Sequence, residues 1–310
     1  MRHWTTDEIP DQSGKVCLIT GANSGIGFYA AKALAEAGSH VVMACRNQSK
    51  ANEARERILR DFPTASLDLV SLDLADLSSI RACAEGLNKQ LKRLDLLINN
   101  AGIMAIPRTE TRDGFEMQLG TNHLGHYALT ALLIDKLIET PKSRIVSVSS
   151  GAHKPGRINF ADLHGKKRYR KWGAYCQSKL ANLLFCYELG RYLKRRNAST
   201  ISVACHPGYA NTNLQMVGPQ QEKSWFALKV MTLGNRLVAQ PAHAGAWPTL
   251  YAATAPVKSG DYIGPSGLFE MTGPPGIVKS SRRSHNEADG EKLWAISEEE
   301  TGVLFPAATE

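Results

Sequence analysis

A tyrosine and a lysine, Tyr175 and Lys179, are the side chains in this sequence best suited to moving a proton. They lie four residues apart, so a helix carries both on one face. A free tyrosine has a pKa of about 10, and a neighbouring ammonium favours the tyrosinate and lowers that pKa. Tyr175 can then exchange a proton with a carbonyl or alcohol oxygen, which accelerates a reaction by about 10²–10⁴-fold. Ser150 is suited to hold the same oxygen by a hydrogen bond.

A glycine turn precedes this pair in the chain. Residues 20–27 read Thr-Gly-Ala-Asn-Ser-Gly-Ile-Gly and directly follow an apolar run. We expect a strand, a sharp turn and an alanine-rich helix, whose N-terminal amides suit a pyrophosphate. Gly21 would take the tight turn, Gly25 would let backbone approach phosphate, and Gly27 would let the helix pack against the strand. The spacing differs from the commoner Gly-x-Gly-x-x-Gly, and an ordinary strand–helix turn is the alternative.

Alternating strands and helices must position these groups. The sequence predicts strands at residues 16–20, 41–44, 67–72, 94–98, 144–149 and 201–205, and helices at residues 24–37, 48–60, 77–91, 113–139 and 174–195. This alternation predicts an α/β fold, a Rossmann-type doubly wound parallel sheet with helices on both faces. We see no repeat or linker, so we expect a single domain over residues 1–310. A cofactor half would span about 12–150, with the catalytic helix, lid and C-terminal part at about 151–310.

Ligands of such sheets lie beyond the carboxyl ends of the strands. Polar residues and turns gather there in this sequence: Asp73, Asn100, Ser149, Ser150 and the Pro207-Gly208 turn. After Gly208 the pattern is irregular but apolar, and residues 213–240 are expected to form a helix on the core, a mobile lid over a substrate or a segment touching a membrane surface.

Composition narrows the class of protein. The chain has 310 residues and a net charge of +8. Its basic clusters at 166–171, 194–196 and 282–283 are short, which favours solvated surface over nucleic-acid binding. None of the six cysteines forms a Cys-x-x-Cys pair or a zinc pattern, so we expect a reducing compartment and no metal. There is no apolar secretory signal and no stable membrane span, and we expect a cytoplasmic protein.

Together these residues resemble the short-chain dehydrogenase/reductase family. The matches are the glycine turn, Asp73, Asn99-Asn100-Ala101-Gly102, Asn122, Ser149-Ser150, Tyr175-Cys-Gln-Ser-Lys179 and Pro207-Gly208, in order across about 200 residues. Residues 44–47, 122–126, 174–182, 206–208 and 292–294 further resemble the branch of the retinol dehydrogenases and the WW-domain oxidoreductases.

The resemblance implies a role for each catalytic residue. Tyr175 would be the acid/base, and Lys179 would lower its pKa and bind the nicotinamide ribose. Ser150 would orient the substrate oxygen, with Ser149 as the neighbouring alternative. Asn122 would hold a water in a proton relay with Lys179.

The resemblance also implies a nicotinamide cofactor. Asp73 would contact the adenine, Asn100 would line the adenosine side, and Thr212 would contact the carboxamide. The complete expected cofactor set is Gly21, Asn23, Ser24, Gly25, Ile26, Gly27, Arg46, Asp73, Leu74, Asn100, Ala101, Gly102, Tyr175, Lys179, Pro207, Gly208 and Thr212. Arg46 suits a ribose 2′-phosphate, and residues 44–47 contain no acid to bind a 2′-hydroxyl, so NADP(H) is expected over NAD(H).

We therefore expect an NADP(H)-dependent oxidoreductase acting on the carbonyl or alcohol of a small lipophilic substrate, such as an aldehyde, ketone, retinoid or steroid. A non-catalytic NADPH-binding sensor or scaffold is one alternative. A C=C reductase resembling protochlorophyllide reductases is another. The resemblance also implies that the chain can form a homo-oligomer, whose number of subunits the sequence leaves open.

Overall fold

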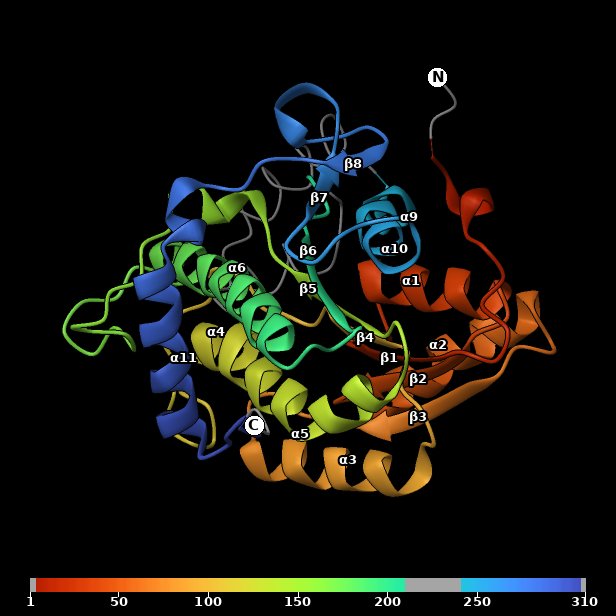
Figure 1. Ribbon diagram of the computed structural model, residues 1–310, viewed down its shortest axis with the longest axis horizontal. Helices are drawn as coiled ribbons and strands as arrows, with labels where there is room; N and C mark the ends of the chain where they lie inside the picture. The colour runs from red at the N-terminus through yellow and green to blue at the C-terminus, as the bar shows by residue number, and fades with distance from the viewer. Residues whose placement is uncertain (1–3, 210–240, 308–310) are drawn as a thin grey trace.

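The computed structural model describes residues 4–209 and 241–307, which form one eight-stranded sheet (Figure 1). The strand order is β3-β2-β1-β4-β5-β6-β7-β8; the pairings from β3 to β7 are parallel, and β8 is antiparallel to β7. The strands are β1 (Val16–Thr20), β2 (His40–Cys45), β3 (Leu67–Ser71), β4 (Leu96–Asn99), β5 (Arg144–Val148), β6 (Ile201–Cys205), β7 (Tyr262–Pro265) and β8 (Pro275–Ile277). The predicted doubly wound sheet is confirmed.

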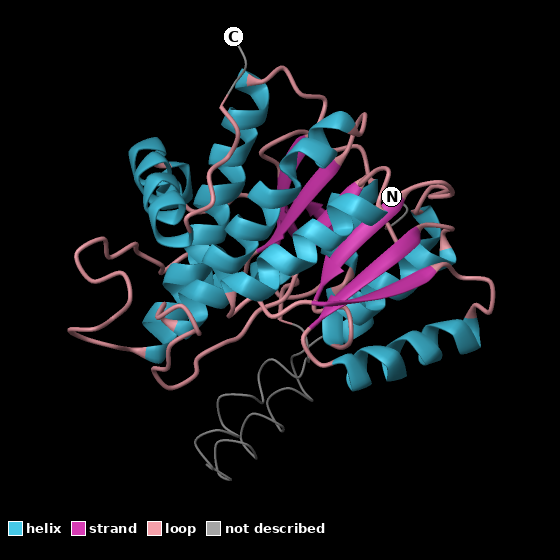
Figure 2. Ribbon diagram, turned by 90° about the horizontal axis from the view of Figure 1, so that it is seen from below, coloured by secondary structure: helices cyan, strands magenta, loops and turns pink. Residues whose placement is uncertain are grey.

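Helices cover both faces of this sheet (Figures 1 and 2). They are α1 (Gly25–Glu36), α2 (Gln48–Asp61), α3 (Leu77–Gln90), α4 (Met117–Leu119), α5 (Gly125–Glu139), α6 (Lys171–Arg195), α9 (Ala242–Gly245), α10 (Trp247–Thr254) and α11 (Glu287–Thr301). Short helical turns are η1 (Thr6–Glu8), η3 (Gly151–His153), η4 (Leu268–Glu270), η5 (Arg282–His285) and the π-helical η2 (Gly120–Leu124). Helices α1, α2 and α10 share one core cluster with the sheet, and α3, α5 and α6 share the other.

The inner strands are largely apolar because both faces of the sheet are buried there. Along β1, Cys17 and Ile19 pack into the cluster under α1, whereas Leu18 packs into the opposite cluster. Successive side chains of a strand point to opposite faces, so a sheet covered twice needs an apolar residue at every position. This is why unbroken apolar runs predicted these strands.

The chain order reverses at β1, which pairs with β2 on one side and β4 on the other. Such a switch point opens a crevice outside the carboxyl ends of the strands, where ligands of open α/β sheets bind. The residues that follow β1, β2 and β4 therefore surround one place.

The helix predicted over residues 113–139 begins later, at Met117. The Glu116 carboxylate accepts hydrogen bonds from the amides of Gln118 (3.0 Å) and Leu119 (2.7 Å) and so caps the first turn. The helix then widens into η2 before α5 continues it. The helix predicted from residue 174 instead begins at Lys171.

Strands β7 and β8 and helices α10 and α11 are not predicted from the sequence. Strands β7 and β8 read Tyr-Ile-Gly-Pro and Pro-Gly-Ile, too short and too rich in glycine and proline to show a strand pattern. Over residues 4–209 and 241–307, no helix is both long and apolar enough to cross a bilayer. Thr212 and residues 213–240, with the proposed lid or membrane contact, lie outside the described residues.

Candidate active site

The glycine turn leaves β1 and enters α1 with two glycines in the left-handed region. Gly21 has φ +68° and Gly25 has φ +54°, conformations that favour glycine. A Cβ on Gly27 would lie 2.4 Å from the Gly21 carbonyl oxygen and 2.5 Å from Asn100 Nδ2. Gly27 therefore allows the turn that leaves β1, and Asn100, to approach α1 closely. Ser24 stands at the N-cap of α1, and its side chain makes no capping bond.

Thr20, the last residue of β1, holds the loop after β4 against this turn. Its Oγ1 accepts hydrogen bonds from the amides of Asn100 and Ala101, each at 2.9 Å. The Asn100 side chain in turn donates to the Thr20 carbonyl at 2.8 Å. On the other side, the Gly21 amide donates to the Ala44 carbonyl at 2.8 Å, and the amides of Ala22 and Asn23 lie beside the buried Cys45 thiol. Ile26 packs partly buried on the core. The turn is thus fixed from both neighbouring strands.

Arg46 and Asp73 meet beyond the ends of β2 and β3. The guanidinium Nη1 lies 3.9 Å from the Asp73 carboxylate, and the arginine side chain is 73% exposed. Asp73 is itself held by its bond from the Ala75 amide at 3.0 Å, while Leu74 is buried against α5. Because Arg46 is exposed beside the crevice, its guanidinium can reach an anionic group of a ligand there. The long Arg46–Asp73 salt bridge does not prevent this.

Ser150, Tyr175 and Lys179 form a group that we call the Ser–Tyr–Lys cluster, in which Tyr175 and Lys179 are buried and Ser150 is partly exposed. The Lys179 ammonium lies 5.8 Å from the centre of the Tyr175 ring, and the Ser150 hydroxyl lies beside the Tyr175 phenol. Burial raises the pKa of Tyr175 to about 12 against the opposite effect of the Ser150 hydroxyl, and it lowers the pKa of Lys179 to about 8. The expected net lowering of the tyrosine pKa is therefore wrong for this structure, because burial outweighs the favourable groups.

The two serines after β5 have different partners. Ser149 Oγ donates to the Lys179 carbonyl at 2.7 Å and lies beside the Tyr262 phenol. Ser150 Oγ accepts from the Ala152 amide at 3.2 Å and faces Tyr175. Ser149 thus braces α6 against the sheet, and the Ser150 hydroxyl is the one beside the phenol.

Asn122, placed on η2, joins the loop after β4 to α6. Its Oδ1 accepts from the Ile103 amide at 2.8 Å, and its Nδ2 donates to the Ile103 carbonyl and to Ser178 Oγ at 3.0 and 2.9 Å. A Cβ on Gly102 would lie 3.1 Å from Asn122 Oδ1 and 3.5 Å from Lys179 Nζ. Gly102, Asn122 and Lys179 are therefore close neighbours.

Two histidines behind the Ser–Tyr–Lys cluster tie its loops together. His153 contacts the Ser150 carbonyl through Nδ1 at 2.7 Å and accepts from the Ser281 amide through Nε2 at 3.0 Å. His206 accepts from the Gly208 amide at 3.2 Å and faces Glu270 at 3.2 Å, which positions the Pro207-Gly208 turn. Burial lowers the pKa of both imidazoles, that of His206 to about 4.

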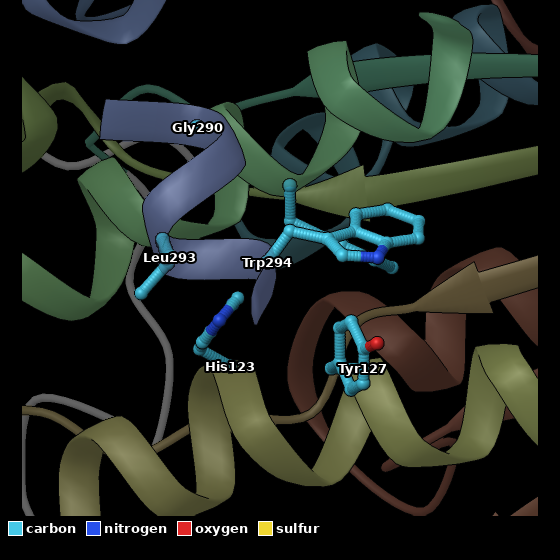
Figure 3. Close-up of a pocket in the computed structure, with 6 residues that line it drawn as sticks. His123, Tyr127, Gly290, Leu293 and Trp294 are labelled. Carbon is cyan, nitrogen blue, oxygen red and sulfur yellow. The ribbon is translucent and has the colours of Figure 1, made fainter. Parts of the chain in front are cut away.

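Figure 3 shows residues that line a small pocket. These residues come from η2, α5, α6 and α11 and pack so closely that no room for a water molecule is left between them: His123, Tyr127, Phe185, Gly290, Leu293 and Trp294. The His123 imidazole is fully buried, with its pKa lowered to about 3, and bonds Ser297 at 2.9 Å. This pocket lies where the helices pack, and none of the predicted site residues lines it.

The structure thus brings together the predicted residues it describes, in two adjoining groups along one edge of the sheet. Sequence reasoning missed the supporting residues His126, His153, His206 and Tyr262. The available signal was spacing: His126 follows Asn122 by four residues, so a helix places them on one side.

The fold and the Ser–Tyr–Lys cluster define a Rossmann-type α/β protein with a tyrosine–lysine site. The family model described as short chain dehydrogenase matches residues 15–223. Human retinol dehydrogenase 11 is 40% identical over 287 residues, which cover 92% of this chain and 85% of that protein. Human retinol dehydrogenase 12 is 40% identical over 295 residues, 94% and 88% of the two chains. The chain belongs to the short-chain dehydrogenase family of oxidoreductases and resembles its retinol dehydrogenase branch.

Solved structures agree with this fold. An uncharacterized protein from Mycobacterium paratuberculosis superposes with a TM-score of 0.82 at 41% identity, covering 99% of this chain and 100% of that one. A short chain dehydrogenase from Shigella flexneri, complexed with NADP, gives a TM-score of 0.63 at 21% identity over 82% and 98% of the chains. The second likeness concerns the fold alone.

Proposed function

We propose that this protein is an NADP(H)-dependent oxidoreductase that interconverts a carbonyl and an alcohol on a lipophilic substrate, with Tyr175 as the acid/base. The observation that carries the proposal is the Ser–Tyr–Lys cluster, in which a buried phenol lies beside a serine hydroxyl and near a buried ammonium. The cluster follows β5 at the same sheet edge as the glycine turn. A binding protein has no need of such an acid–base group.

The residues present fit a dinucleotide. The turn at Gly21 and Gly25, the approach of Gly27 to its own turn, and the uncapped start of α1 leave backbone amides for a pyrophosphate. Asp73 and Asn100 would hold the adenosine side, and Pro207-Gly208 and Thr212 the nicotinamide side. When bound, NADP(H) supplies or accepts the hydride.

The chain's own residues handle the proton. With a pKa of about 12, Tyr175 is protonated at neutral pH and donates its phenolic proton to a carbonyl oxygen during reduction. Ser150 orients that oxygen through its hydroxyl. Lys179, charged below about pH 8, stabilises the tyrosinate that remains. Asn122 holds the Ile103 loop and Ser178 beside this lysine.

Arg46 supports NADP(H) over NAD(H), because its exposed guanidinium can pair with a 2′-phosphate. The Shigella flexneri protein, which is complexed with NADP, shares the fold. Competitive titration of NADPH against NADH tests the preference, and tighter binding of NADH would overturn it.

The names of the relatives support a lipophilic alcohol or aldehyde such as a retinoid, since they are retinol dehydrogenases. The cytoplasmic location and a homo-oligomer remain predictions.

The test is NADPH oxidation over a panel of lipophilic aldehydes and ketones, run with wild-type protein and Tyr175→Phe. The proposal expects turnover by the wild type, a loss of at least about 10²-fold in the variant, and unchanged NADPH binding. Turnover unaffected by Tyr175→Phe would refute the assigned role. NADPH binding without turnover would favour a sensor, and saturated carbonyl products from enones would favour a C=C reductase.

A further inference from the structure

His126 is a buried histidine on α5 that the proposed chemistry does not use. Its side chain is 3% exposed and lies between the end of β1 and η2. Nδ1 lies 3.0 Å from the Asn122 carbonyl oxygen, and Nε2 lies 2.8 Å from Thr20 Oγ1. One imidazole therefore contacts both groups of the candidate site.

The partners fix where the protons are. A carbonyl oxygen only accepts, so Nδ1 carries the hydrogen and donates it to Asn122. Thr20 Oγ1 already accepts from two amides, those of Asn100 and Ala101, so its own proton is left to donate. His126 Nε2 at 2.8 Å is a closer acceptor than the Ile98 carbonyl at 3.4 Å. The imidazole is thus neutral, in agreement with burial lowering the pKa of His126 to about 4.

The two ends of this hydrogen-bonded chain have different tasks. Thr20 holds the loop of Asn100 and immediately precedes Gly21, so it supports the proposed dinucleotide site. Asn122 holds Ile103 and Ser178, the residue before Lys179, so it supports the Ser–Tyr–Lys cluster.

We propose that His126 is a positioning residue that fixes the cofactor turn through Nε2 and the Asn122 peptide through Nδ1–H. This inference rests on the proposed oxidoreductase function. It assigns Nε2 to NADPH affinity and Nδ1 to kcat. Replacing His126 by asparagine or by glutamine tests the two assignments separately.

In His126→Asn, the side-chain amide occupies the place of Nδ1 and keeps a donor for the Asn122 carbonyl, but Thr20 loses its acceptor. In His126→Gln, the amide reaches the place of Nε2 and keeps an acceptor for Thr20, but the Asn122 carbonyl loses its donor. Loss of one buried hydrogen bond corresponds to about tenfold. We expect His126→Asn to raise the NADPH Kd about tenfold with kcat little changed, and His126→Gln to lower kcat about tenfold with Kd little changed.

Two further variants test the role of His126 independently. Thr20→Val removes the hydroxyl from the opposite side, together with its bonds from the Asn100 and Ala101 amides, and should raise the NADPH Kd at least as much as His126→Asn does. His123→Gln is the matched control, because His123 is equally buried on η2 but bonds Ser297 on α11, and it should leave the ratio of the two parameters unchanged.

Equal effects of the asparagine and glutamine variants on both parameters would overturn the inference and leave the proposed function intact. Failure of both His126 variants and Thr20→Val to fold, while His123→Gln folds, would also overturn it, because His126 would then be merely structural. If the wild type turns over no carbonyl substrate, the proposed function fails. The NADPH Kd of His126→Asn and Thr20→Val, measured by fluorescence titration, then decides the inference by itself.

Discussion

Replacing Gly27 with alanine tests the geometry of the glycine turn. The new Cβ would lie 2.4 Å from the Gly21 carbonyl oxygen and 2.5 Å from Asn100 Nδ2. Non-bonded atoms pack at about 3.5 Å, so these groups must separate by about 1 Å. One of them is backbone, and the other donates to the Thr20 carbonyl at 2.8 Å. Overpacking of this kind costs about 1–3 kcal/mol.

Gly86 provides the matched control, because it lies inside α3 with nothing within 4 Å of an added Cβ. Gly86→Ala should raise the free energy of unfolding by about 0.5–1 kcal/mol, the ordinary gain of alanine in a helix. Gly27→Ala should lower that free energy by about 1–3 kcal/mol and raise the NADPH Kd at least about tenfold. Urea unfolding and NADPH fluorescence titration measure both quantities. If Gly27→Ala matches the wild type in both, the close approach of turn and helix is refuted.

Three more predictions follow from the charges of the site. In wild-type protein, kcat/KM for carbonyl reduction should fall above about pH 8, where Lys179 loses its proton. Lys179→Arg should remove that fall, since arginine keeps its charge. The same pH profile in the variant and the wild type would contradict the proposed role of Lys179. Arg46→Asp should weaken NADPH binding at least about tenfold. Arg168→Asp makes the same change of charge on an exposed loop and should leave NADPH binding unchanged. Equal losses of NADPH affinity in the two variants would show only a long-range charge effect. Burial lowers the pKa of His123 to about 3 and of His126 to about 4, so the unfolded chain binds more protons than the folded chain below pH 6.5. As the pH is lowered from 6.5 to 4, the free energy of unfolding should fall, by at most about 1.4 kcal/mol per pH unit for each histidine. A flat urea-unfolding profile over this range would contradict their neutral state.

Much of the fold could be predicted because its causes are local. The runs around Leu18 and Val42 are apolar at every position, which two-sided burial of a parallel sheet requires. Strand β7 could not be predicted, because Gly264 and Pro265 weaken the strand pattern and its stability comes from pairing with β6.

In the candidate site, too, contacts between residues close in sequence could be predicted and long-range contacts could not. Tyr175 and Lys179 were found because helical spacing alone places them together. His126 and Thr20 are 106 residues apart in sequence, and His153 and Ser281 are 128 apart, so only the folded chain brings them into contact. The pKa of Tyr175 was predicted in the wrong direction because burial, the largest influence on it, is a property of the tertiary structure.

The most direct test of the proposed activity follows the hydride itself. Wild-type protein is incubated with a lipophilic aldehyde and NADPH carrying deuterium at the transferable position of the nicotinamide, and the alcohol is examined by mass spectrometry and NMR. The account predicts one deuterium on the carbinol carbon, and an at least about 10²-fold slower appearance of that product with Tyr175→Phe. An alcohol without deuterium, or equal rates from the two proteins, would contradict it.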